Sequence, residues 1–233
     1  MPIHIFFSLI ASGLILGLAA WVFVRNPKSP INLWYALTMA TTGFWGFIES
    51  FLLLGRTVEW VMIWGVISYA CVPVIPFCFL QFTYCFPHQT KPFSAPSRTV
   101  ALLLLLLSTV IAATPGGVVK SPILRPTYGD LVLNTFGWAV WAIIFFTLFV
   151  WGYYNLFQKL RRSSGFLKQQ LTHVIILTII PVIIATIFSA LAPIFYGESY
   201  GWVGVLSLIV PALGGFYYLT LFSKKIYIDR RPP

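Results

Sequence analysis

One acidic side chain lies well inside a long apolar segment of the sequence, and it belongs to Glu49. On a helix, Trp45 and Leu53 lie one turn before and one turn after this residue. A carboxylate in hydrocarbon costs several kcal/mol at least, so Glu49 should face the interior of a helix bundle, find a partner or stay protonated. Two interpretations are open at this point. Glu49 could form a proton-sensitive or ligand-binding site, or it could make a structural hydrogen bond close to the membrane interface.

Aromatic residues near Glu49 indicate what a binding site could contain. Trp45 shares a helical face with Glu49, while Trp64 and Tyr69 belong to the next apolar segment. Large rings could line a pocket for a small or lipidic ligand, and the carboxylate would fix its orientation. The sequence therefore predicts a ligand-binding site made of Trp45, Glu49, Trp64 and Tyr69.

The other reactive residue types do not form the pattern of an enzyme or of a cofactor site. The five acidic residues and three histidines include no plausible nucleophile and base, and no spaced metal ligands. Cys71, Cys78 and Cys85 are about 10 Å apart on a helix, too far for a disulfide. No lysine lies within 202–222 to form a Schiff base with retinal. We expect no catalytic residue, no metal and no cofactor.

The elements that position these residues should be membrane helices. Of the 233 residues, 59% are hydrophobic and only 9% are charged, too few charges to cover a soluble domain. The apolar runs reach about 20 residues, the length of a helix that crosses a bilayer. The net charge of +10 comes from basic residues at the ends of these runs. That placement favours membrane lipids as partners and argues against nucleic acid.

Seven apolar runs predict an all-α fold, a polytopic bundle of seven transmembrane helices. Pro73 and Pro76 should kink the third helix. Residues 1–222 would form the transmembrane domain and residues 223–233 a short basic cytoplasmic tail. The expected spans are residues 3–24, 33–54, 61–86, 100–113, 136–157, 170–194 and 202–222.

Basic residues are distributed unevenly between the connections. Twelve of the 15 lie in the odd-numbered connections and the tail, and three lie in the even-numbered connections. Because basic residues accumulate on the cytoplasmic side, the N-terminus should be outside and the C-terminus inside. The connection between the fifth and sixth spans is the most basic. We expect Arg161 and Arg162 to form a cytoplasmic output face that contacts a partner.

The order of these features resembles the seven-transmembrane N-terminal sensor region of bacterial histidine kinases and related signalling proteins. The resemblance covers nearly the whole chain, and it implies a sensor in the bacterial inner membrane that is joined to a cytoplasmic output domain. No such domain follows Pro233, so we expect either the membrane region of a longer protein or a chain that acts through a partner. The matching features are Asn32 and Trp45 in the second span, Pro73, Pro76, Phe79 and Phe82 in the third, Lys168-Gln169-Gln170-Leu171 at the start of the sixth, and Tyr217-Tyr218 and Leu221-Phe222 in the last.

Three functions are compatible with these observations. The first is a membrane sensor that binds a small or lipidic ligand and passes helix shifts to an output domain or partner. The second is a non-catalytic subunit or scaffold of a larger membrane complex, and the third is a small transporter. A downstream kinase domain would favour the sensor, whereas stable co-purification with a complex would favour the subunit.

Overall fold

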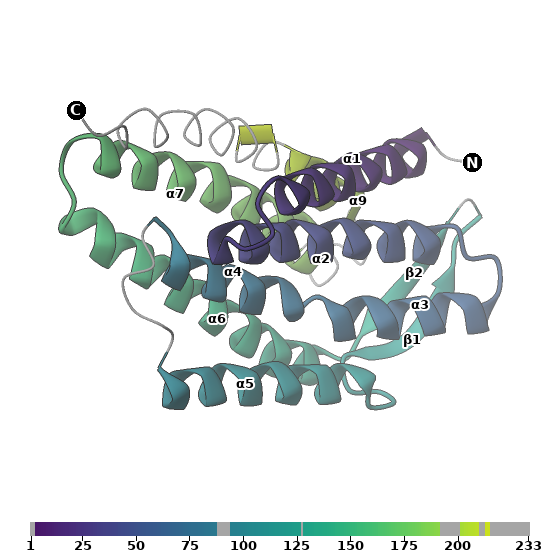
Figure 1. Ribbon diagram of the computed structural model, residues 1–233. Helices are drawn as coiled ribbons and strands as arrows, with labels where there is room; N and C mark the ends of the chain where they lie inside the picture. The colour runs from purple at the N-terminus through teal and green to yellow at the C-terminus, as the bar shows by residue number, and fades with distance from the viewer. Residues whose placement is uncertain (1–2, 88–93, 127, 192–200, 210–212, 215–233) are drawn as a thin grey trace, which may run out of the picture.

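The computed structural model describes residues 3–87, 94–126, 128–191, 201–209 and 213–214. Long helices run side by side through the molecule, as Figure 1 shows. We call one end the hairpin end, because it carries two short strands and the connection 54–57; the opposite end, with the turns 26–29 and 162–164, is the turn end. The elements are α1 Ile3–Arg25, α2 Pro30–Leu53, α3 Val58–Cys71, α4 Val74–Cys85, α5 Ala95–Ala113, β1 Val119–Leu124, β2 Gly129–Leu133, α6 Thr135–Arg161, α7 Gly165–Ala185, the π-helix η1 Thr186–Leu191 and α9 Gly201–Ser207.

The described residues contain six helical stretches that are long and apolar enough to cross a membrane. They coincide with the first six spans expected from the sequence. The seventh expected span, 202–222, lies mostly outside the described residues, although α9 begins there as a helix. The expected tail, 223–233, lies outside the described residues entirely. The six stretches are Ile3–Arg25, Pro30–Leu53, Val58–Cys85, Ala95–Ala113, Thr135–Arg161 and Gly165–Phe188.

Local signals fix where the helices begin. The Ser29 side chain accepts a hydrogen bond from a backbone N–H in the first turn of α2, and Pro30 occupies the first turn. Thr57 caps α3 in the same way. Asn134 caps α6 directly after β2. These caps satisfy N–H groups that have no partner within the helix.

The third span is interrupted where its prolines predict. Helix α3 ends at Cys71 and α4 begins at Val74, so Pro73 lies in the break. Proline has no N–H to donate and its ring crowds the preceding turn, which breaks the helical hydrogen-bond pattern. The prediction of a kink in this span is confirmed.

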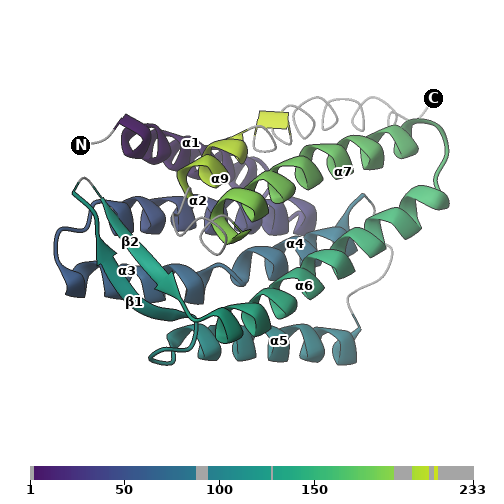
Figure 2. The ribbon, with the colours of Figure 1, turned by 180° about the vertical axis from the view of Figure 1, so that it is seen from behind.

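A β-hairpin is a correction to the expected all-α fold. Strands β1 and β2 pair antiparallel in a segment that the sequence analysis treated as a loop. Pairing satisfies the backbone polar groups while Leu131 packs onto α3, where a Cβ on Gly65 would lie 2.7 Å from Leu131 Cδ1. Gly129 also lies tightly against the bundle, because a Cβ there would be 2.7 Å from the Leu52 carbonyl oxygen. Figure 2 shows β2 leading directly into α6 at this end.

The packed interior has two main parts along the bundle. Towards the turn end, Phe79, Phe82 and Tyr153 belong to a cluster shared by α1, α2, α4, α6 and α7. Towards the hairpin end, Trp45 and Trp141 belong to a second cluster that includes residues of α1, α2, α5, α6 and α9. The two buried acids among the described residues, Glu49 and Asp130, lie beside the second cluster and belong to the candidate site.

Candidate ligand-binding site

A cavity of about 100 Å³ lies inside the hairpin half of the bundle. Its walls come from α2, α3, the start of α4, β2, α6, α7 and η1, together with Leu208 just after α9. This volume is several times the minimum that one ordered water needs, so the cavity has room for several waters. A small organic molecule therefore fits between the helices.

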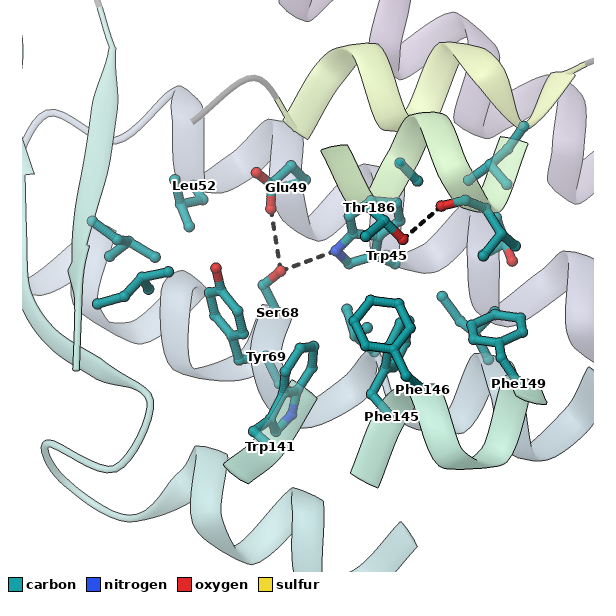
Figure 3. A pocket seen from close by; sticks show the side chains of 18 of the residues that line it. Trp45, Glu49, Leu52, Ser68, Tyr69, Trp141, Phe145, Phe146, Phe149 and Thr186 are labelled. Carbon is teal, nitrogen blue, oxygen red and sulfur yellow. Dashed lines mark hydrogen bonds between the residues drawn. The ribbon is translucent and has the colours of Figure 1, made fainter. Parts of the chain in front are cut away.

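One wall of the cavity carries a chain of hydrogen bonds. The Trp45 indole Nε1 donates to Ser68 Oγ at 3.1 Å, and Ser68 Oγ donates to Glu49 Oε2 at 3.2 Å. Trp45 and Glu49 are one helical turn apart on α2, whereas Ser68 comes from α3. Only 8% of Glu49 is exposed, and Figure 3 shows its carboxylate above Ser68 at the edge of the cavity. The hydrogen bond from Ser68 on α3 therefore holds the Glu49 carboxylate of α2 in place.

The opposite wall is aromatic and is supplied mainly by α6. Trp141 and Phe145 stack with their centroids 5.2 Å apart, and Phe149 meets Phe145 edge-on at 5.1 Å. Tyr69 packs against Trp141 at 5.3 Å, and the Trp141 indole donates to the Tyr69 carbonyl at 3.1 Å. Figure 3 shows these rings across the cavity from Glu49. The rings therefore form a large wall, and ring contacts and a hydrogen bond hold them in place.

The hairpin supplies a second acid. Asp130 lines the cavity from β2 and is 1% exposed. Its Oδ2 atom lies 3.3 Å from Arg125 Nη2, and its Oδ1 atom accepts the Leu131 N–H at 2.9 Å. Arg125 itself is 31% exposed and is not among the residues that line the cavity. The ion pair holds the hairpin turn together and positions Asp130 at the cavity.

Helix α7 borders the cavity where its hydrogen-bond pattern changes. Val182, Ala185 and Thr186 line the cavity directly after Pro181, and the π-helix η1 starts at Thr186. Proline inside a helix removes one backbone hydrogen bond, and π-turns occur frequently at functional sites. This part of the wall therefore departs from regular α-helix.

Residues 7–226 match the N-terminal 7TM region of histidine kinase. The chain belongs to this family. The match takes in every element that lines the cavity. This chain is accordingly a multi-pass membrane protein and a membrane sensing module of the histidine kinase sensor family. A comparison with curated proteins found no match.

The structure of this histidine kinase sensor region brings together three of the four residues predicted to bind a ligand. Trp45, Glu49 and Tyr69 all line the cavity, and the prediction that Glu49 faces the interior is confirmed. Trp64 does not line it; its ring stacks on Phe51 at 5.0 Å in a cluster beside the hairpin. Trp64 lies one turn closer to the hairpin end than Ser68, where residues of the hairpin cover the face of α3.

Several cavity residues were not anticipated. Ser68 connects Trp45 to Glu49 by hydrogen bonds. Its position one helical turn after Trp64 could have indicated that both residues lie on one face of α3. Asp130 could have been noticed because it precedes the apolar run 131–133. Trp141 and Phe145 follow i, i+4 spacing on α6, but that spacing does not say which face of α6 meets the cavity. Their inward direction depends on how the helices pack.

At the turn end, Lys159 makes a set of contacts that the sequence analysis overlooked. Its Nζ donates to the backbone carbonyls of Thr83, Tyr84 and Phe86 at 2.7, 3.0 and 2.6 Å. A cation at the C-terminal end of a helix interacts favourably with its last carbonyls. Lys159 thereby ties α6 to the end of α4. The two arginines predicted as the output face, Arg161 and Arg162, follow it and are exposed.

The residues that the structure describes contain no group of three or more His, Cys, Asp and Glu side chains that could hold a metal ion. Cys71, Cys78 and Cys85 are free thiols. The cavity lining presents two carboxylates, the Ser68 hydroxyl and aromatic faces.

Proposed function

We propose that this sensor region binds a small or lipidic ligand in the cavity and passes the event along its helices to a cytoplasmic output domain or partner. The observation that carries this proposal is the continuity of α6. The helix runs unbroken from cavity-lining Trp141 to Arg161, a distance of about 30 Å at 1.5 Å per residue. A displacement of the aromatic wall is thereby transmitted to the turn end.

Helix α7 supplies the movable element in this mechanism. A ligand that contacts Ala185 and Thr186 presses on the segment after Pro181, where regular helix gives way to η1. Lys159 ties α6 to α4, so α4 and α6 should move together while α7 shifts against them. Helix displacements of about 1–2 Å are a common form of such signals.

The charge distribution supports the direction of signalling. The turn end carries Arg25, Lys28, Arg161 and Arg162, whereas the hairpin end carries fewer basic residues. The turn end therefore faces the cytoplasm under the positive-inside rule, and the hairpin and N-terminus face outward. In a bacterial inner membrane, the ligand would reach the cavity from the outer half, and Arg161 and Arg162 would contact the output partner.

The test is to fill the cavity from α7. Ala185→Phe places a ring in the cavity, and Ile183→Phe places the same ring on an exposed position two residues away. Each chain is purified from native membranes, and the small molecules and lipids that accompany it are identified by mass spectrometry. We expect one bound species to be present in the wild type and in Ile183→Phe and to be strongly reduced in Ala185→Phe.

A second readout tests transmission. Spin labels at Asn26 and Ser163, both in turns of the turn end, report the distance between α1–α2 and α6–α7. The distance distribution should change when the bound species is removed from the wild type, but not from Ala185→Phe. Equal small-molecule content in all three chains, or a distance unaffected by removal of the ligand, would contradict the proposal.

A further inference from the structure

We propose that the ligand of this cavity is a small organic cation, namely a substituted ammonium group on a compact apolar body. This inference rests on the proposed function, because it names the chemical class that the same cavity takes. It comes from the shape and composition of the cavity, in which aromatic faces lie opposite carboxylates.

The aromatic wall is the first part of the argument. Trp45, Tyr69, Trp141, Phe145 and Phe149 all line one cavity of about 100 Å³. Aromatic faces carry negative electrostatic potential and attract ammonium groups within about 6 Å of the ring centroid. Several rings around one small space are the arrangement that recognises substituted ammonium ions, whose methyl groups also gain from apolar contact.

The charges on the lining are the second part. Glu49 and Asp130 line the cavity, and none of its described lining residues is a lysine, arginine or histidine. Asp130 pairs with Arg125, which lies outside the cavity, and Glu49 accepts a hydrogen bond from Ser68. The described lining therefore carries acids and no bases. A positive charge inside the cavity would be attracted by both carboxylates.

The size of the cavity sets the third constraint. Room for several waters corresponds to a compact organic cation. Choline is a cation of this kind. The same ammonium chemistry is also present in the headgroups of zwitterionic lipids, so both a soluble cation and a lipid headgroup satisfy the cavity. An anion would be repelled by the two carboxylates, and an uncharged ligand would gain no charge attraction from them.

The first experiment uses the wild-type chain in maltoside micelles and measures binding of radiolabelled choline by equilibrium dialysis. Dimethylbutanol, the uncharged carbon isostere of choline, serves as the competitor that matches it in shape. We expect choline to bind at least about tenfold more tightly than the isostere, since one favourable charge interaction of modest strength corresponds to that ratio. Equal affinities, or no binding of choline, would overturn the cationic class.

Two pairs of variants place the binding in the cavity. Glu49→Gln keeps an oxygen that can accept the Ser68 bond but removes the charge, and Glu59→Gln is its control at an exposed position. Phe145→Leu removes one ring of the wall, and Phe44→Leu is its control on an exposed face of α2. Glu49→Gln should weaken choline binding at least about tenfold, and Phe145→Leu about threefold to thirtyfold. Unchanged affinity in both would overturn the proposal.

A competition experiment with lipids distinguishes the two sources of the ammonium group. Short-chain phosphatidylcholine and phosphatidylglycerol with the same acyl chains are compared as competitors of choline. Displacement by phosphatidylcholine alone identifies a headgroup as the ligand, and displacement by neither lipid identifies a soluble cation. Both results support the cationic class, whereas equal displacement by the two lipids contradicts it.

The Ala185→Phe variant distinguishes a failure of this inference from a failure of the proposed function. If dimethylbutanol binds as tightly as choline and Ala185→Phe abolishes its binding, the cavity is a ligand site and only the cationic class is wrong. If choline binds the wild type and Ala185→Phe equally, the cavity is not the binding site and both proposals fail.

Discussion

At the hairpin end of the bundle, Glu49 and Asp130 are turned inward and are almost entirely buried. At the turn end, Arg161 and Arg162 are exposed, and the half-buried Lys159 binds three backbone carbonyls. The hairpin end therefore holds two buried acids at a cavity, while the turn end uses a charge to hold two helices together. The difference indicates that a ligand can bind at the hairpin end and that a partner can detect its effect at the turn end.

The two ends also differ in what connects their helices. A packed hairpin closes the hairpin end, with Leu131 against Gly65 and Gly129 against Leu52. At the turn end, α6 and α7 are joined by three residues, and the Lys159 contacts run from α6 to α4. We therefore expect relative motion between α6 and α7 to be less restrained than motion between α6 and α4.

The largest effect on stability should come from the contacts of Lys159 at the turn end, which clamp α6 to the end of α4. Lys159→Met removes charge-assisted hydrogen bonds to three carbonyls at the end of α4. We expect the free energy of unfolding to fall by about 2–4 kcal/mol, because partly buried acceptors lose a charged donor. Lys168→Met, at an exposed position on α7, is the matched control and should change it by less than about 0.5 kcal/mol. Denaturant unfolding in mixed micelles measures both, and equal losses would show that Lys159 is not a clamp.

The second effect tests the hydrogen-bond chain at the hairpin end. Ser68→Ala deprives Trp45 of an acceptor and Glu49 of a donor, and should lower the free energy of unfolding by about 1–3 kcal/mol. Ser108→Ala is the control, because that buried hydroxyl bonds only the Leu105 carbonyl in its own helix. Its cost should be below about 1 kcal/mol, since alanine also favours helix. Similar losses in the two variants would mean that the hydrogen bonds of Ser68 to Trp45 and Glu49 contribute no more to stability than those of an isolated buried serine.

A smaller effect is expected from the hairpin ion pair. Asp130→Asn, Arg125→Met and the double variant form a cycle that isolates their interaction. Arg125 is 31% exposed, so solvent weakens the attraction, and we expect a coupling of about 0.5–1.5 kcal/mol. Thermal unfolding of the four chains provides the measurement. A coupling near zero would show that hairpin packing, and not the ion pair, positions Asp130.

The sequence was sufficient for the spans and for part of the site. Long apolar runs and prolines specify six helices and the break near Pro73, because both act within one segment. Trp45 and Glu49 could be paired from helical spacing alone. The face that α6 presents could not, because the inward position of Trp141 depends on packing with α3. The hairpin was missed because β1 is only six residues long and contains Pro122, which obscures its strand pattern. The sequence also could not show that Trp64 lies outside this cavity, because its ring packs in the same cluster as Tyr128 and Leu131 of the hairpin segment, which was not anticipated.

The smallest effect on stability is expected from changes to the two arginines of the output face. Arg161→Gln with Arg162→Gln removes two exposed charges after the Lys159 clamp, so the free energy of unfolding should change by less than about 0.5 kcal/mol. Ligand content should stay the same, since Phe149, the cavity-lining residue of α6 nearest to the turn end, is still about 18 Å from Arg161 along the helix. The amount of kinase or partner protein that co-purifies from native membranes should fall, because the contact surface loses its charge.

Basic residues also determine membrane orientation, so insertion must be checked in the same double variant. A cysteine at Ser163 should react with an impermeant maleimide only from the cytoplasmic side, and a cysteine at Arg56 only from outside. If orientation is preserved and partner recovery falls, Arg161 and Arg162 carry output as proposed. If orientation is preserved and partner recovery is normal, these arginines only orient the chain, and the message must leave the bundle through another part of the turn end.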